Sequence, residues 1–364
     1  MTRDSLCSDD WLTLVARLGG PAYLAATARQ TRAFLRCREI ASPLDLLRLV
    51  LAYCLGRHGL RSTTGWACAA GLVDISNVAL LQRLRRCGDW FALLIGDVLA
   101  RRAPLASHGR MIRIIDATAV PKAGKAASKS NKLWRIHSAF DLPSERFGHF
   151  ELTDQSAGER LDRIPVIPGE IRLADRAYLK PARIATVLEA GADVVVRTGW
   201  RAAHWLDGEG EPWDLIATLR TAPGDLIDQT IWLGRKSAPA LQLRLVAIRK
   251  PAAAAVEARR KARRDAQRER YQISDATLIA ADWVMLITSL SAAEFSAQDV
   301  LSLYRLRWRI ELGFKRLKSI IGLHGPPGTH ERSARPWLLA HLLMILLLEP
   351  LVDELEDSPR RAAA

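Results

Sequence analysis

Four residues in the segment 304–318, YRLRWRIELGFKRLK, have the spacing expected of one helix face. They are Tyr304, Arg307, Glu311 and Lys318. At about 100° per residue, an α-helix places all four within an arc of about 80°, beside an apolar stripe. One carboxylate among cationic and hydroxyl groups suits the joint binding of a metal ion and phosphate groups. The alternative is an ordinary amphipathic helix whose charges are solvated.

Two aspartates upstream each follow a predicted buried strand. The segment 111–120, MIRIIDATAV, is rich in β-branched residues and carries Asp116, and the segment 170–178, EIRLADRAY, leads to Asp175. A strand that ends on a carboxylate places that group at the edge of a sheet, where metal sites are built. The alternative for each is an aspartate that ends a strand and begins a turn.

These motifs together resemble a known family. The order Tyr, Arg, Glu, Lys at this spacing resembles the YREK signature of DDE transposases of bacterial insertion sequences. DATAV (116–120) and ADRAY (174–178) resemble the family's first and second aspartate motifs, and the resemblance extends over about residues 111–323. It implies an α/β fold, an RNase H-like mixed sheet flanked by helices. It also implies that Asp116, Asp175 and Glu311 form a catalytic, metal-binding triad. By the same resemblance, Tyr304, Arg307 and Lys318 would bind DNA phosphate.

Residues 1–107 predict an all-helical N-terminal domain. Ser42-Pro43 is a good helix start, and Gly56 ends that helix. A short helix over 62–70, a turn at Gly71 and an arginine-bearing helix from 77 suggest a helix-turn-helix. A plain helical bundle explains the same pattern equally well. The family resemblance places recognition of the element's ends in this region, which favours DNA binding.

The rest of the chain predicts a catalytic core interrupted by an insertion. Strands at 133–142, 146–154 and 193–198, with a helix ending at Gly191, complete the first part of the core, 108–198. The long gap between Asp175 and Glu311 predicts an inserted domain. Alternating segments within it predict a β-rich domain with a basic arm. The insertion is expected over 199–282, with β segments at 204–219, 225–234 and 240–250. The second part of the core is expected over 283–350, with a buried helix at 337–348. A tail, 351–364, follows.

Two features of this region have competing interpretations. Residues 249–270 hold nine basic and three acidic residues, which suits either a clamp on the DNA backbone or a solvated helical arm. Trp283, on the strand predicted over 281–290, is a candidate for stacking on a flipped base, as a similarly placed tryptophan does in relatives. The alternative is a core tryptophan in an apolar strand.

Composition agrees with a nucleic-acid partner. The 364 residues include 53 Lys+Arg against 39 Asp+Glu, a formal net charge of +14, which favours a polyanion: nucleic acid first, an anionic membrane second. The five cysteines form no CxxC pair, which indicates reduced thiols in a cytosolic protein. The apolar run 337–348 is too short to span a membrane. The expected location is the bacterial cytoplasm, with nucleoid association when DNA is bound.

The sequence thus predicts a cut-and-paste DNA transposase. It would bind terminal inverted repeats in double-stranded DNA and pair two ends, which needs at least a dimer. Two Mg²⁺ ions, for which Mn²⁺ can substitute, would support hydrolysis of phosphodiesters, and the freed 3′-OH would then attack target DNA. Two alternatives remain: a catalytically silent DNA-binding protein derived from a transposase, and an RNase H-like nuclease that cuts without joining.

Overall fold

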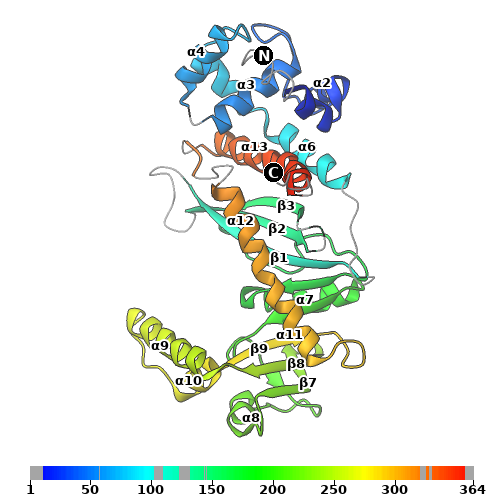
Figure 1. Ribbon diagram of the computed structural model, residues 1–364, viewed down its shortest axis with the longest axis vertical. Coiled ribbons are helices and arrows are strands. Elements are labelled where there is room, and N and C mark those ends of the chain that lie inside the picture. Colours follow the sequence, from blue (N-terminus) through cyan, green and yellow to red (C-terminus); the bar gives the residue numbers. More distant parts are fainter. Residues whose placement is uncertain are drawn as a thin grey trace, which may run out of the picture.

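The computed structural model describes residues 11–56, 58–101, 110–122, 132–142, 144, 146–319, 325–327 and 330–356, without the side chains of 312, 316–319 and 349–356. An N-terminal group of helices, a large sheet and a helix-flanked far end follow one another along the molecule (Figure 1). The helices and strands are α2 Gly20–Gln30, α3 Pro43–Leu55, α4 Leu60–Ala69, α5 Asn77–Leu84, α6 Gly88–Ala100, β1 Ile112–Pro121, β2 Leu133–Asp141, β3 Arg146–Asp154, β4 Ile171–Ala174, η1 Arg176–Tyr178, α7 Pro181–Glu189, β5 Asp193–Arg197, β6 Trp205–Leu206, α8 Leu215–Thr221, β7 Leu226–Arg235, β8 Ala238–Arg249, α9 Ala252–Arg268, α10 Asp275–Ala281, β9 Trp283–Thr288, α11 Ala297–Arg305, η2 Leu306–Trp308, α12 Arg309–Ser319 and α13 Glu331–Glu356.

Every element that the structure describes in the N-terminal region is a helix, as the sequence predicts. Ser42 caps α3 by accepting a hydrogen bond from the amide of Asp45, and the helix ends at Gly56. Gly71, with a φ of 65°, makes the turn between α4 and α5. Of the cysteines, Cys54 and Cys87 are buried thiols and all four in the described residues are free; Cys7 lies outside those residues.

The sheet is mixed and has the strand order β3-β2-β1-β4-β5-β9-β8-β7-β6. The meander β1-β2-β3 is antiparallel, whereas β1 pairs with β4 and β4 with β5 in parallel. This arrangement is the RNase H-like sheet that the sequence predicted. The strands β7 and β8, from the region expected to be an insertion, continue the same sheet through the antiparallel β8–β9 pair.

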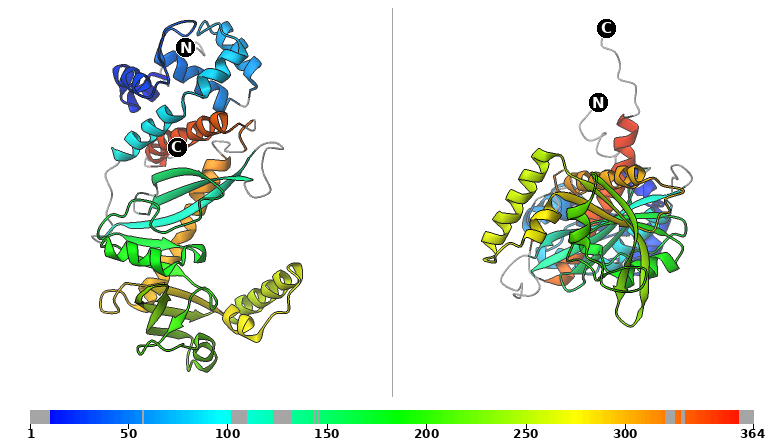
Figure 2. Two further views of the ribbon diagram at one scale, coloured as in Figure 1. Left: turned by 180° about the vertical axis from the view of Figure 1, so that it is seen from behind. Right: turned by 90° about the horizontal axis from the view of Figure 1, so that it is seen from below.

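Alternation along the strands gives the sheet two apolar faces. Ile114 and Leu173 pack on one side, in a core shared with α11, α12 and α13, and Ile115 and Ala174 pack on the other, in a core shared with α7. Seen from behind and from below, helices cover both faces (Figure 2). The helix predicted over 337–348 is the buried part of α13.

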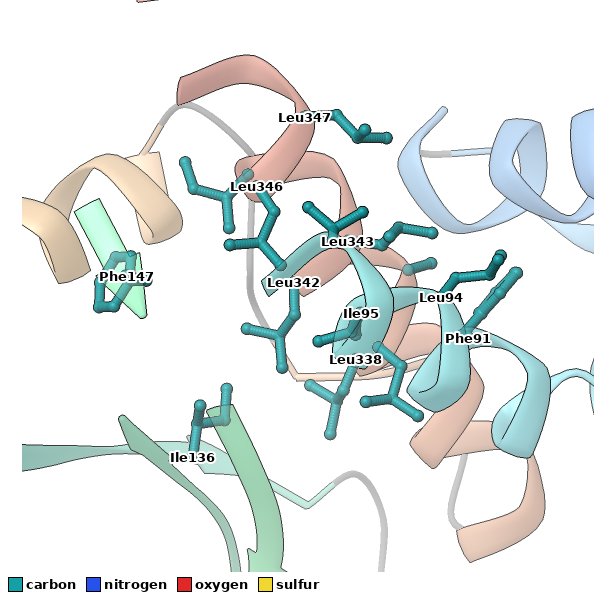
Figure 3. Packing of buried hydrophobic residues seen from close by; sticks show 14 of the residues in the cluster. Phe91, Leu94, Ile95, Ile136, Phe147, Leu338, Leu342, Leu343, Leu346 and Leu347 are labelled. Atoms are coloured by element: carbon teal, nitrogen blue, oxygen red, sulfur yellow. The ribbon is translucent and has the colours of Figure 1, made fainter. Parts of the chain in front are cut away.

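The helix α13 joins the N-terminal helices to the sheet. Figure 3 shows Leu338, Leu342 and Leu343 of α13 beside Phe91 and Ile95 of α6, with Phe147 of the sheet nearby. All of these side chains belong to one continuous apolar cluster. The N-terminal helices are therefore not a loosely tethered unit, because they share a core with the sheet.

Three predictions of secondary structure were wrong. The strand predicted to end at Asp116 continues to Pro121, because β1 pairs with β2 as far as that residue. The helix predicted over 304–318 is interrupted: α11 ends at Arg305, the 3₁₀ turn η2 spans Leu306–Trp308, and α12 begins at Arg309. A 3₁₀ turn advances about 120° per residue, so the continuous-helix wheel does not hold across it. The β segment predicted over 204–219 contains only the short strand β6. It is followed by the helix α8, which Asp214 caps by accepting a hydrogen bond from the amide of Ala217.

A buried charged cluster fixes the start of β4. The guanidinium of Arg172 is fully buried and donates to Glu170 and to the carbonyls of Leu161, Ile164 and Pro165. Glu170 also accepts a 3.2 Å hydrogen bond from Arg113 of β1. The cluster thus holds the connection before β4, and β4 itself, against β1.

Replacement of Arg172 by Ala should therefore destabilise the fold strongly. It would leave the buried Glu170 with one partner fewer and three carbonyls without a donor, and breaking such a buried pair costs about 3–5 kcal/mol. Urea unfolding would measure the change in the free energy of unfolding. Arg220→Ala, on the exposed side of α8, is the control and should change it by less than about 0.5 kcal/mol. A loss below about 1 kcal/mol for Arg172→Ala would contradict this account.

Candidate active site

Asp116 lies within β1, and Asp175 directly follows the neighbouring parallel strand β4. Ile115 of β1 pairs with Ala174 of β4, and the residue that follows each of them is an aspartate. Asp116 also shares the face of Ile114, and Asp175 the face of Leu173, because side chains alternate along a strand. Both carboxyl groups are therefore directed to the face that α11 and α12 cover.

Each aspartate also accepts a local backbone hydrogen bond. Asp116 Oδ1 accepts from the amide of Ala117 at 2.8 Å, and Asp175 Oδ1 accepts from the amide of Arg176 at 2.6 Å. Asp175 is the N-cap of the turn η1 that follows β4. The turn-forming role that the sequence left open for Asp175 is thus present in the structure, alongside its position at the sheet edge.

Arg307 connects Glu311 to the first aspartate. Its Nη2 donates to Glu311 Oε1 at 3.0 Å, and its Nη1 lies 3.5 Å from Asp116 Oδ2. Arg307 lies in η2 and Glu311 in the first turn of α12. In Figure 1, α11 and α12 run across the sheet beside β1, which brings this helical segment to Asp116. The four-residue spacing from Arg307 to Glu311 still forms an ion pair, despite the 3₁₀ turn.

The structure describes the side chain of Tyr304 but not that of Lys318. The hydroxyl of Tyr304 is buried and has no hydrogen-bond partner within the described residues, and its ring centroid lies 5.9 Å from the Arg307 guanidinium. Burial raises the pKa of Tyr304, while the charge of Arg307 lowers it. Lys318 belongs to α12, but its side chain lies outside the described residues.

The surroundings of Asp116 shift the pKa of its carboxyl group. Burial raises its pKa from 3.8 to about 6; the Ala117 amide and Arg307 lower it, and the charges of Glu159 and Asp175 raise it further. Both carboxylates are thus near enough to disfavour a charge on Asp116. A cation bound between these groups would remove that penalty.

Sequence reasoning missed two groups at this site. Glu159 lies in the connection between β3 and β4, 3.6 Å from Arg135, and adds a fourth carboxylate near Asp116. The hydroxyl of Tyr178 is buried without a partner among the described residues, and burial, followed by the charge of Asp116, raises its pKa. Tyr178 could have been found, since it belongs to the ADRAY motif. No local signal marks Glu159.

A basic hollow of about 410 Å³ opens beside Asp175. Arg176, Arg197, Lys250 and Lys261 line it, so it extends from the sheet edge to the basic helix α9. Two tryptophans also line this hollow: Trp200, which is partly exposed, and Trp283, which is only 3% exposed and has the Arg249 guanidinium 4.5 Å from its ring centroid. This burial favours the core interpretation of Trp283.

The predicted triad fits a divalent metal ion in chemical type. Carboxylate oxygens are the ligands that Mg²⁺ prefers, and Asp116 is a partly buried acid whose charge is disfavoured without a cation nearby. Within the described ranges, no three His, Cys, Asp or Glu side chains are close enough together to hold an ion. In this arrangement Arg307 is the cation that contacts both Asp116 and Glu311.

The fold and these residues define a transposase of the DDE class. Residues 107–347 match the family described as the transposase DDE domain, and the chain belongs to that family. Similar proteins are known from Escherichia coli. A putative transposase InsL for insertion sequence element IS186A, from strain K12, is 36% identical over 363 residues, covering 98% of this chain and 97% of that protein. The transposase for insertion sequence element IS421 is 36% identical over 364 residues, with the same coverage.

Membership of this family implies that the protein acts on DNA and uses a divalent metal ion. It also confirms the class of protein that the motifs predicted. Within the described part of the chain, no helix has the length and apolar character needed to cross a membrane.

The raised pKa of Asp116 predicts a pH-dependent effect of Asp116→Asn in metal-free buffer. The native carboxyl holds its proton up to about pH 6, whereas the unfolded one releases it near 3.8, so the native protein loses stability relative to the variant as pH rises through this window. One unit of pKa corresponds to 1.36 kcal/mol, so the difference in unfolding free energy should shift by about 3 kcal/mol in favour of Asn.

Chemical denaturation with EDTA at pH 4, 5, 6 and 7 would measure this shift. Asp74→Asn, at an exposed position before α5, is the control and should show no comparable change in the same window. A constant difference between wild type and Asp116→Asn across the four pH values would show that Asp116 is not buried as described.

Proposed function

We propose that the protein is a cut-and-paste transposase that binds the terminal inverted repeats of an insertion sequence, cleaves the DNA and joins the 3′-OH ends to a target. The observation that carries the proposal is the placement of three acids. Asp116 and Asp175 lie side by side on parallel strands, and Glu311 is joined to Asp116 through Arg307. The match to the DDE domain supports the same assignment.

In this proposal Asp116, Asp175 and Glu311 are the catalytic residues and hold two divalent ions, Mg²⁺ or Mn²⁺. When bound, such ions activate the attacking hydroxyl and offset charge on the leaving oxygen. In the first reaction, a water oxygen bonds to phosphorus and the P–O3′ bond breaks, leaving a 3′-OH and a 5′-phosphate. In the second, that 3′-OH bonds to a target phosphorus and displaces a target 3′ oxygen, so one phosphodiester replaces another.

Arg307, Tyr304 and Lys318 are assigned to the DNA phosphates. The guanidinium of Arg307 can donate two parallel hydrogen bonds to one phosphate, but in the structure its N–H groups face Glu311 and Asp116. Phosphate binding would exchange these carboxylates for phosphate oxygens. The buried, unpartnered hydroxyl of Tyr304 would gain an acceptor in the same step.

The basic hollow beside Asp175 offers a path for the DNA backbone. Its cations come both from strand ends of the sheet and from α9, where Lys261 is exposed and makes no ion pair within the described residues. This supports the clamp interpretation of the 249–270 arm. If an aromatic stacks on a base here, the partly exposed Trp200 is better placed than the buried Trp283.

The remaining assignments follow from this function. We divide the chain into a DNA-binding helical domain (1–107), a catalytic core in two parts (108–198 and 283–350), an insertion with the basic arm (199–282) and a tail (351–364). Joining two ends requires at least two copies of the chain in the DNA complex. The DNA substrate implies action in the cytoplasm, at the nucleoid.

Glu311→Gln should abolish metal-dependent cleavage, by at least about a thousandfold, while DNA binding persists, because it removes one ligand charge without changing side-chain size. The assay uses DNA flanking the protein's own gene, with Mg²⁺, Mn²⁺ or EDTA, and scores nicking and joined products separately. Glu189→Gln, an exposed acid at the end of α7, is the matched control and should cleave normally.

The other possible results of this assay would reject the triad or favour one of the two alternative functions. Cleavage retained by Glu311→Gln would reject the triad. Wild-type binding without metal-dependent cutting would identify a silent DNA-binding protein, and cutting without joined products a nuclease.

Tyr304→Phe should separate stability from activity. Removing a buried hydroxyl that has no partner should raise the free energy of unfolding by up to about 1 kcal/mol, whereas losing a hydrogen bond to phosphate should slow cleavage by roughly tenfold or more. Thermal unfolding and cleavage rates would be measured on the same preparations. Tyr53→Phe, in α3, is the control for cleavage. Unchanged cleavage by Tyr304→Phe would remove Tyr304 from the phosphate-binding set.

A further inference from the structure

A second basic hollow lies where the N-terminal helices meet α13. Its volume is about 920 Å³, larger than that of the hollow beside Asp175. Three segments that are distant in sequence form it: the turn after α2, the connection from α5 to α6, and the first turns of α13. Five arginines line it against two acids, Asp89 and Glu331; the arginines are Arg32, Arg85, Arg86, Arg332 and Arg335.

Two of the five arginines have partners that hold them in place. Arg335 Nη1 is 2.5 Å from Asp89 Oδ1, and Arg85 Nε donates to Ser333 Oγ at 3.0 Å. The other three, Arg32, Arg86 and Arg332, are exposed and make no ion pair or side-chain hydrogen bond within the described residues. Three unneutralised guanidinium groups therefore surround one hollow. Ordinary solvated arginines would explain any one of them, but not their convergence from three segments.

The backbone around the hollow also favours an anion. The N-terminus of α6, at Gly88 and Asp89, lies in its wall, and Cys87 gives this helix no side-chain cap. The first turn of α13 also lines the hollow, at Glu331 and Arg332, although the amide of Arg332 already donates to His330 Nδ1. Each helix N-terminus carries the positive end of the helix dipole, which adds to the field of the arginines, and the uncapped α6 also has free amide groups.

Arg32 has a backbone conformation that its own side chain disfavours. Its φ is 60°, in the left-handed region, just after α2. Glycine is the usual residue at such a helix end, because a side chain there costs free energy. An arginine at this position is costly for the fold alone. Its side chain lines the hollow, so binding of a ligand there would explain why an arginine occupies this position.

The walls of the hollow are held rigidly. Phe91, Leu94 and Ile95 of α6 pack against Leu338 and Leu342 of α13 just beyond it (Figure 3). The arginines on the two helices therefore keep a fixed spacing without a ligand, which reduces the cost of ordering them on binding.

We propose that this hollow binds the phosphodiester backbone of double-stranded DNA, as a site separate from the catalytic acids. The inference rests on the proposed function, and it assigns Arg32, Arg86 and Arg332 as the phosphate contacts. A hollow of about 920 Å³ lined by arginines from three segments suits consecutive phosphates rather than one small anion. Because α13 shares one core with the sheet, DNA held here is attached directly to the catalytic part of the molecule.

The test compares DNA binding by the full chain and a triple variant, Arg32→Gln, Arg86→Gln and Arg332→Gln. Fluorescence anisotropy would follow binding to two duplexes, one from the end of the protein's element and one of unrelated sequence, between 0.05 and 0.3 M salt. Each lost phosphate contact should lower the log–log salt slope by about 0.9. Affinity near 0.15 M salt should fall by about tenfold or more.

Two controls separate phosphate binding from a structural role. The same three positions changed to Lys keep the charges and should keep most of the salt slope. The variant Arg220→Gln, Lys236→Gln removes exposed cations that make no ion pair with any described residue, one from α8 and one from the β7–β8 turn, and should leave the slope unchanged. α8 lies at the opposite end of the molecule from the N-terminal helices (Figure 1).

Arg32→Gly gives a second, independent readout. Glycine accepts the left-handed backbone, so the melting temperature should stay the same or rise while DNA affinity falls. Unchanged affinity in both Arg32→Gly and the triple Gln variant would overturn the proposal.

The pattern across the two duplexes identifies the source of the phosphates. A loss confined to the end duplex would assign the hollow to the element's end, and an equal loss on both to DNA backbone of any sequence; either supports the site. A wild-type protein that binds neither duplex would overturn it. Wild-type binding without metal-dependent cutting would reject the proposed cleavage function and leave this test intact.

Discussion

The parallel pairing of β1 with β4 is the constraint on which the candidate active site depends. Ile115 lies opposite Ala174, so Asp116 and Asp175 follow at the same level and on the same face. A slip of one residue would turn one aspartate toward the α7 side of the sheet. The buried Arg113–Glu170–Arg172 cluster secures the register, because both strands contribute to it. Three charged side chains deep in the fold thus position the two aspartates.

The second constraint is the break between α11 and α12. A 3₁₀ turn at Leu306–Trp308 places Arg307 between the two helices, from where it contacts both Glu311 and Asp116. The third acid is thereby connected to the sheet by a cation of the protein itself. An arginine in this position limits the repulsion among the acids in the free protein and is also suited to meet a phosphate.

Much of this arrangement was predictable from the sequence because the signals were local. The apolar strand segments that lead to Asp116 and Asp175, and the Ser42 and Gly56 helix boundaries, depend on neighbours in the chain. The 3₁₀ turn was not predictable, since Leu306–Trp308 carries the same amphipathic pattern in either helix type. The α8 helix was missed because the alternation before it was extended too far, past the capping Asp214. The position of Glu159 near Asp116, and the hollow where the N-terminal helices meet α13, both arise from contacts between segments that are distant in sequence. A single sequence does not reveal such contacts.

The continuity of the nine-stranded sheet has a consequence for how such proteins can be shortened. β9 pairs with β5 on one side and with β8 on the other, so removing β6–β8 would leave β9 as a long open edge of apolar residues, prone to pair with another chain and aggregate. By contrast, α9 is a mostly exposed helix that follows β8, outside the sheet. Length variation among related proteins should therefore be concentrated in the arm, and the strands beside it should be retained even where their surface has no contact with DNA.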